Sequence, residues 1–382
     1  MNFTEARLKV TGDGVEAIRT SGRTGVRPLE ESDLPRIIEL YERVFSERPG
    51  AASGVARPHL RDIFWRHPWR DDTMPSLVYE ETPGRVVGCL GVMPRPMSIE
   101  GRSVRAAISH TFMVDPDHRA GLAGLALART FLAGPQDLSI AEGGEASRRL
   151  LERLGGTTVL GYSLRWTRPL RPCRYLVSHL ARRGVPSGLT RLLRPFAAAA
   201  DALMARLPRA PFRTLRSRLT EEPLDPAALQ SGIEELSRER ALRPIYQPET
   251  LAWLLDLLEP KRERGTLEAI ALRDADDRVA GWYVAYLNPG GISEVVQIGA
   301  RRGAMQEVLE QLFRRLWSRG AIAVSGQLDP QRFESFARSG CLFHHDGRSW
   351  FLVYSRRPDL IEAIHRGDAL LGRLEGEWSI GF

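Results

Sequence analysis

The segment from Ile108 to Leu127 combines residue types that suit a binding site for an anion. It reads Ile-Ser-His-Thr-Phe-Met-Val-Asp-Pro-Asp-His-Arg-Ala-Gly-Leu-Ala-Gly-Leu-Ala-Leu. A strand is expected to end at Val114, a turn follows at Pro116, and a loop of small residues opens directly into an amphipathic helix. Small residues let the backbone approach a ligand closely, and the free N–H groups of a helix start favour negative charge. We therefore predict that this loop binds a phosphate or pyrophosphate group.

The loop lacks the spacings of two other phosphate-binding motifs. It contains neither G-x-x-x-x-G-K-[ST] nor G-x-G-x-x-G, which argues against a nucleoside triphosphatase and against a dinucleotide-binding enzyme.

Length and composition narrow the class of protein further. A chain of 382 residues suggests two domains, and 43% hydrophobic with 26% charged residues is typical of a globular protein. Cys89, Cys173 and Cys341 lie far apart, so neither a disulfide framework nor a metal site is expected. No apolar run approaches the roughly 20 residues of a membrane span, and the N-terminus lacks a signal-peptide pattern. These features predict a cytoplasmic protein.

The positive charge does not by itself indicate a nucleic-acid partner. The net charge is +7, yet Lys9 and Lys261 are the only lysines, and arginines occur throughout the chain beside similar numbers of acids. This pattern favours a compositional bias over a basic binding surface, so no nucleic acid is expected as a partner.

Periodicity along the chain predicts an α/β (α+β) fold with two domains. After a lead-in at 1–24, residues 25–170 show the order β-α-(α)-β-β-β-α-β-α-β, with a final strand at 157–166. Residues 221–356 repeat this order, which suggests a tandem arrangement. Residues 357–382 form a tail that is expected to dock between the domains.

An Arg-rich helical linker is predicted at 171–220, broken at prolines. Its leucines and arginines are amphipathic. The helices are expected either to pack onto one of the domains or to contact a membrane surface peripherally through 174–217.

The strand ending at Val114-Asp-Pro-Asp-His-Arg and the small-residue loop after it resemble the acyl-CoA-binding motif of GNAT N-acetyltransferases. The resemblance covers roughly residues 26–166. It implies a mixed, mostly antiparallel sheet flanked by helices in each domain, and acetyl-CoA or another acyl-CoA as co-substrate. It also implies that amides of Met113 and Val114 bind the pantetheine arm and that the loop surrounds the pyrophosphate. The motif can be aligned at His118 or, with a deletion, after Arg119. The expected cofactor-binding residues are Phe112, Met113, Val114, His118, Arg119, Ala120, Gly121, Leu122, Ala123 and Gly124.

Attack of an amine on a thioester needs a neutral amine, so a nearby base is useful. Alternation places His110, Phe112 and Val114 on one face of their strand, and His110 is the expected base. Glu142 is the next choice, together with Glu145, although both could instead cap a helix. Leu151 occupies the position where the family often has a general-acid tyrosine, so Tyr162 is the candidate acid by proximity in sequence.

The second half carries a degenerate form of the same loop at Gln297-Ile-Gly-Ala-Arg-Arg-Gly. A structural half that shapes the substrate cleft is expected there. His344-His345-Asp346 is interpreted as a turn rather than a metal site, because adjacent side chains of a strand point to opposite faces.

Together these features predict an acyl-CoA-dependent N-acyltransferase. It would move an acetyl group to an amine or hydroxyl of a small-molecule, sugar or peptide acceptor. Amides near Met113 would polarise the thioester carbonyl. The alternatives are a FemAB-like aminoacyl transferase and a catalytically degenerate scaffold or regulator in an envelope-polysaccharide pathway. A monomer or homodimer is expected.

Overall fold

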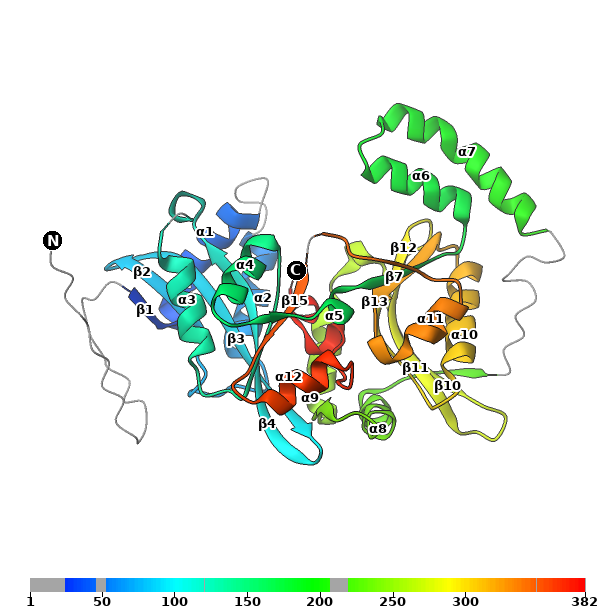
Figure 1. Ribbon diagram of the computed structural model, residues 1–382. Coiled ribbons are helices and arrows are strands. Elements are labelled where there is room, and N and C mark those ends of the chain that lie inside the picture. Colours follow the sequence, from blue (N-terminus) through cyan, green and yellow to red (C-terminus); the bar gives the residue numbers. More distant parts are fainter. Residues whose placement is uncertain (1–24, 46–52, 120, 207–218, 348, 382) are drawn as a thin grey trace.

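The computed structural model describes residues 25–45, 53–119, 121–206, 219–347 and 349–381. These residues form two mostly antiparallel sheets flanked by helices, which confirms the predicted fold class (Figure 1). The strands of the first sheet are β1 (Gly25–Pro28), β2 (Leu77–Thr82), β3 (Arg85–Ile99), β4 (Arg102–Val114), β5 (Leu138–Gly143), β6 (Thr157–Thr158), β9 (Leu242–Pro244) and β15 (Trp350–Tyr354). Those of the second are β7 (Arg165–Pro169), β8 (Thr220–Pro223), β10 (Thr266–Arg273), β11 (Val279–Leu287), β12 (Ile292–Ala300), β13 (Ala323–Gln327) and β14 (Leu342–His344).

The first sheet is built around the long hairpin of β3 and β4. Its order is β1-β2-β3-β4-β5-β15-β6, and β9 pairs with the far end of β3. All neighbours are antiparallel except β4 and β5, which run parallel and pair only at 106–108 and 138–140. Beyond Ile108 and Ile140 these two strands have no paired residues, so the sheet opens at the carboxyl end of both.

Helices cover both faces of this sheet. On one face lie α1 (Leu34–Phe45) and α2 (Ser53–Trp65), and on the other α3 (Ala123–Leu132) and α4 (Glu145–Arg153). Apolar residues of α1 recur at helical spacing and are buried against the sheet (Leu34, Ile37, Ile38 and Leu40). Cross-strand partners share a face, so alternate residues of β3 and β4 meet one helical layer or the other.

The second sheet has the order β14-β7-β13-β12-β11-β10-β8. The helices α10 (Met305–Ser318) and α11 (Phe333–Arg338) pack against this sheet in one hydrophobic cluster. The helices α8 (Pro226–Leu236) and α9 (Pro248–Leu258) share another cluster with α1 and α2. One hydrophobic core therefore spans the two halves.

Two strands do not follow the domain boundaries expected at 170 and 356. The expected strand from Thr157 to Trp166 is interrupted by the short helix α5 (Leu160–Ser163), and β7 joins the second sheet. In return, β15 from the second half lies between β5 and β6 of the first sheet. Trp166 explains the first exchange, because its side chain is fully buried beside Phe313 and Phe336. Alternation reveals a strand but not the sheet that it joins.

Two further segments belong to neither sheet. In Figure 1 the hairpin of α6 (Pro172–Arg182) and α7 (Ser187–Met204) stands out from the body beside the second sheet. The chain ends with α12 (Pro358–His365) and a tail at 366–381 that runs between the two sheets. The expected lead-in at 1–24 and the linker part at 207–218 lie outside the described residues. Among the described helices, none is long and apolar enough to cross a membrane.

Candidate active site

A β-bulge near the end of β4 shapes the opening in the first sheet. Thr111 has a positive φ of 50°, and the pairing of β3 with β4 shifts between Cys89 and Gly91. The bulge moves the following residues to the other face. His110 therefore packs against Phe64 of α2, whereas Phe112 packs in the cluster that contains α3. The expectation that His110 shares a face with Phe112 and Val114 was wrong, because simple alternation does not foresee a bulge.

The loop after β4 leads into α3 as the sequence indicates. Pro116–His118 form a 3₁₀ turn, and the Asp115 carboxylate accepts a hydrogen bond of 3.0 Å from the amide of Asp117. Leu122 precedes α3 and its side chain caps no amide, so the first-turn N–H groups remain open to a ligand. Gly124 approaches the side chains of Val114 and Phe112 closely, which brings the helix start against the strand end.

Two basic residues of this loop have different surroundings. His118 lies 3.3 Å from Glu81 and 3.6 Å from Asp115, so two carboxylates already face its ring. Arg119 is exposed, and no hydrogen bond or ion pair links it to another described residue. Of the two possible alignments of the motif, the one that leaves Arg119 as the cation available to a phosphate therefore fits these surroundings better. Ala120 lies outside the described residues.

His110 lies in an apolar, enclosed position. Its side chain is 1% exposed, it sits over Gly91 of the neighbouring strand, and its Nε2 has no hydrogen-bond partner among the described residues. Burial, together with smaller electrostatic effects of His67 and His59, lowers the pKa of His110 to about 3. A base of this strength accepts few protons near neutral pH. The surroundings of His110 therefore do not favour the expected role.

The Tyr162 hydroxyl is already hydrogen-bonded away from the opening, and Leu151 has no proton to donate. The Tyr162 hydroxyl donates to the carbonyl of Ala369 at 2.8 Å and accepts from the amide of the same residue at 3.3 Å. Burial also raises the pKa of Tyr162. Leu151 is buried in the hydrophobic cluster beneath α4. The role of Tyr162 as an acid remains a prediction that none of its contacts supports.

Glu142 is joined at the opening by a residue that sequence reasoning missed, Glu377 of the tail. The Glu377 carboxylate accepts a 2.7 Å hydrogen bond from the amide of Thr111, within the bulge. Glu142 lies at the end of β5, and Gly376 of the tail passes so close to its Oε1 that a β-carbon at position 376 would displace this carboxylate. Two half-buried carboxyl groups thus lie near each other where β4 and β5 separate.

The two carboxyl groups influence each other's protonation. Burial raises the pKa of Glu142, and burial together with the charge of Glu142 raises the pKa of Glu377 to about 8. Two neighbouring negative charges disfavour each other's ionisation, so the pair retains a proton near neutral pH. Such a pair can accept a proton from an amine. An unusual Glu-x-Glu spacing beside Trp378 was the only hint in the sequence.

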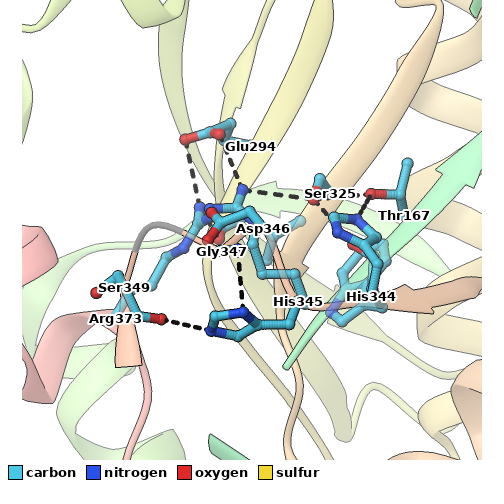
Figure 2. Close-up of polar contacts among 12 residues, drawn as sticks. Thr167, Glu294, Ser325, His344, His345, Asp346, Gly347, Ser349 and Arg373 are labelled. Atoms are coloured by element: carbon cyan, nitrogen blue, oxygen red, sulfur yellow. Dashed lines mark hydrogen bonds and ion pairs between the residues drawn. The ribbon is translucent and has the colours of Figure 1, made fainter. Parts of the chain in front are cut away.

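The tail is held in place by Arg373. Its guanidinium donates to the carbonyl of Val295 at 2.9 Å and lies 3.5 Å from Glu294. Figure 2 shows Glu294 and Arg373 between the strands of the second sheet. Burial raises the pKa of Glu294, but Arg373 and two other arginines more than offset this and hold it below its usual value. The second sheet therefore positions Glu377 against the first.

The His344-His345-Asp346 segment makes separate polar contacts rather than one cluster (Figure 2). His344 Nε2 lies 2.9 Å from the Thr167 hydroxyl, and His345 Nε2 lies 3.0 Å from the carbonyl of Ser349. Within the described ranges, no three metal-ligating side chains converge on a common point.

Comparison with known proteins identifies the first unit. Residues 25–132 match the model of the acetyltransferase (GNAT) domain. This range ends with α3, so it includes the strand, bulge and loop described above. The chain therefore carries a GNAT acetyltransferase domain. No curated protein matches the sequence.

Solved structures resemble most of the chain. They include a probable N-acyltransferase of Enterococcus faecalis (11% identity, TM-score 0.55, 87% of this chain and 72% of that one). A GCN5-related N-acetyltransferase from Kribbella flavida has 15% identity and a TM-score of 0.55 over 87% of this chain and 71% of that one. Saccharomyces cerevisiae N-myristoyltransferase with bound myristoyl-CoA has 10% identity and a TM-score of 0.50 over 90% and 80%. At these identities the likeness concerns the fold.

Proposed function

We propose that the protein is an acyl-CoA-dependent N-acyltransferase, with acetyl-CoA as the first donor to test. The observation that carries this proposal is the opening between β4 and β5. This opening combines strand edges without a pairing partner, a helix start without a side-chain cap and two half-buried carboxyl groups. Unpaired backbone groups of a strand edge can hydrogen-bond the amides of the pantetheine arm of CoA. The free N–H groups of a helix start can bind its pyrophosphate.

The chemistry follows from the positions of these groups. The amine nitrogen attacks the thioester carbonyl carbon, forming the C–N bond, and the C–S bond then breaks. The Glu142–Glu377 pair takes the proton that the amine loses and returns it to the departing thiolate of CoA. Backbone amides near Met113 stabilise the oxyanion that develops on the carbonyl oxygen.

Two other functions make different predictions. A FemAB-like transferase would require aminoacyl-tRNA and would bind CoA poorly, and a degenerate scaffold would bind neither donor productively. The GNAT family match over the loop supports the CoA-dependent reaction. The exposed, unpaired Arg119 supports it as well.

The test combines binding with turnover. Calorimetry of the full-length protein with acetyl-CoA is expected to give saturable binding at one site, and mixed amine pools are expected to release CoA thiol. Addition of tRNA should change neither result. Absence of acetyl-CoA binding, with no CoA detected on the purified protein by mass spectrometry, would contradict the proposal.

A further inference from the structure

Arg95 is a buried cation that forms no hydrogen bond or ion pair with a described residue. Its side chain is 5% exposed, and none of its three guanidinium nitrogens has a hydrogen-bond partner among the described residues. One face of the guanidinium lies 3.7 Å from the ring centroid of Trp69. Burial of an unpaired guanidinium is costly, so a structure that retains one generally has a partner for it. Burial also lowers the pKa of Arg95, to about 10, which leaves it charged near neutral pH.

Arg95 lines a small cavity between the two halves of the chain. Its walls also include Trp69, Tyr246, Ile140 and Glu375. Glu375 is not a free partner for Arg95. Its carboxylate already accepts hydrogen bonds from the Tyr246 hydroxyl at 2.8 Å and the Gly372 amide at 2.6 Å.

The cavity lies beside the carboxyl pair on the same face of the sheet. Ile140 precedes Glu142 by two residues on β5, which corresponds to about 7 Å along a strand. On β3, Arg95 is four residues from Gly91, the partner of His110, or about 13 Å along the strand. An acceptor extending from the carboxyl pair along this face would reach Arg95.

We propose that Arg95 binds a carboxylate of the acceptor, so that the protein acylates amines that carry a carboxylate at their far end. The planar guanidinium offers a fork of N–H groups that suits a carboxylate, while Trp69 holds its orientation. This inference rests on the proposed acyltransferase function and names the substrate class of the same site.

A matched pair of amines tests the inference. Aminocaproate and hexylamine have chains of similar length and differ in the terminal carboxylate. The wild-type protein with acetyl-CoA is expected to favour aminocaproate at least about tenfold in kcat/KM, the loss typical of a buried polar group left unpaired. Arg95→Met should abolish this preference, so that the ratio of kcat/KM for the two amines falls to about one. Arg95→Lys, which keeps the charge but not the fork, should restore it only in part.

Two measurements separate this inference from the proposed function and from a structural role. Calorimetric affinity for acetyl-CoA should be the same in wild type and Arg95→Met. The melting temperature of Arg95→Met should equal or exceed that of wild type, because an unpaired buried charge is removed. Equal acylation of both amines by wild type, or a lower melting temperature of Arg95→Met, overturns the role of Arg95. Failure to bind acetyl-CoA or to acylate either amine overturns the acyltransferase function instead.

The hairpin of α6 and α7 supports a second, independent inference. Six large apolar side chains on it are exposed (Leu176, Leu189, Leu192, Phe196, Leu203 and Met204). The two helices pack on each other through Val177 and Ala197, and no other described element packs substantially against them. In Figure 1 the hairpin extends away from both sheets. The expectation that it packs onto a domain is therefore not what the structure shows.

The apolar side chains of α7 form a stripe, and the hairpin is cationic. At about 100° per residue, Leu189, Leu192, Phe196 and Leu203 lie within an arc of about 60°. Residues 172–206 contain six arginines and one acidic residue, Asp201, a net charge of +5. Asp201 is buried and accepts hydrogen bonds from the amides that begin α6, so its carboxylate is directed into the hairpin.

We infer that the hairpin docks on a bilayer surface with anionic headgroups. Apolar side chains along one helix would enter the interface while arginines attract anionic lipid, and each alone gives only weak binding. Arg182 ends α6 and Arg183 follows it, and both are exposed and close in sequence to the start of the stripe.

Sedimentation of the full-length protein with lipid vesicles tests the docking. Binding to vesicles of phosphatidylcholine with phosphatidylglycerol is expected to exceed binding to phosphatidylcholine alone and to weaken with salt. Leu192→Asp with Phe196→Asp should reduce binding at least about tenfold. Arg182→Gln with Arg183→Gln should reduce vesicle binding while the circular dichroism spectrum stays unchanged.

Binding that is independent of phosphatidylglycerol overturns the inference. So does a dimer in sedimentation velocity that the aspartates dissociate, because a second copy then covers the stripe.

Discussion

Replacing Glu377 by Gln is expected to lower kcat by about a hundredfold or more, the usual effect of losing a general base. The substitution keeps the shape of the side chain, and the amide oxygen can still accept the hydrogen bond from Thr111. It removes the group that takes the proton from the amine. Affinity for acetyl-CoA, measured by calorimetry, should remain unchanged, because the glutamine keeps the size of the side chain and the contact with Thr111.

The pH dependence of the wild-type protein gives the same residue a second signature. Because the carboxylate is the active form, kcat/KM should rise with pH and level off above about 8. This value belongs to the Glu142–Glu377 pair rather than to one residue. This rise of kcat/KM with pH should be absent in Glu377→Gln.

Thermal unfolding should show the corresponding linkage. The folded-state pKa of Glu377, about 8, is above the usual 4.5. The folded protein therefore holds a proton that the unfolded chain releases, and the stability of wild type relative to Glu377→Gln should fall as pH rises through this window.

Two variants serve as comparisons for Glu377→Gln. Glu145→Gln makes the same chemical change at the exposed start of α4 and should leave kcat unaffected. His110→Asn separates the two candidate bases. If His110 were the base, this variant would lose activity. The rise of wild-type kcat/KM with pH would then lie well below pH 6, because the pKa of His110 is about 3. Full activity of Glu377→Gln across the pH range would exclude the carboxyl pair as the proton acceptor.

The second large effect is expected from the loop before α3. Arg119→Glu combined with Gly121→Asp should weaken acetyl-CoA binding by more than about a hundredfold, because a charge-assisted hydrogen bond worth about 2 kcal/mol is lost and repulsion is added. Both positions are exposed, so the fold should tolerate the changes. Calorimetry measures the affinity directly.

A charge reversal on the same helix controls for long-range electrostatics. Arg129→Glu changes the net charge as much as Arg119→Glu but lies near the other end of α3. It should alter the affinity at most twofold to threefold, because solvent and salt screen exposed charges at this distance. Equal affinity in the loop variant and wild type would show that the pyrophosphate binds elsewhere.

The strand, turn and helix around Val114 could be predicted because each depends on nearby residues. Pro116 specifies a turn, small residues at 120–124 permit a close backbone approach, and apolar spacing specifies the helix. The strand pattern of β4 was likewise recognisable. The bulge at Thr111 was not, because both registers preserve an apolar strand and only packing against α2 and α3 selects one.

Assignment of catalytic residues could not be made from residue types alone. His110 has the right ordinary pKa for a base, but its position between Gly91 and Phe64 removes water from the ring. Glu377 has the wrong ordinary pKa, and burial beside Glu142 raises it to about 8. A side chain's titration depends on its solvation and neighbouring charges, which only the folded structure supplies.

By itself the sequence determined the fold class, the GNAT-like strand, loop and helix, and the absence of the other phosphate-binding motifs. Tertiary structure decided which strands belong to which sheet and which residues meet at the opening. Glu377 reaches Thr111 from 266 residues away along the chain. No local pattern encodes such a contact, because it depends on the Arg373 anchor in the second sheet and on the close passage of Gly376 over Glu142.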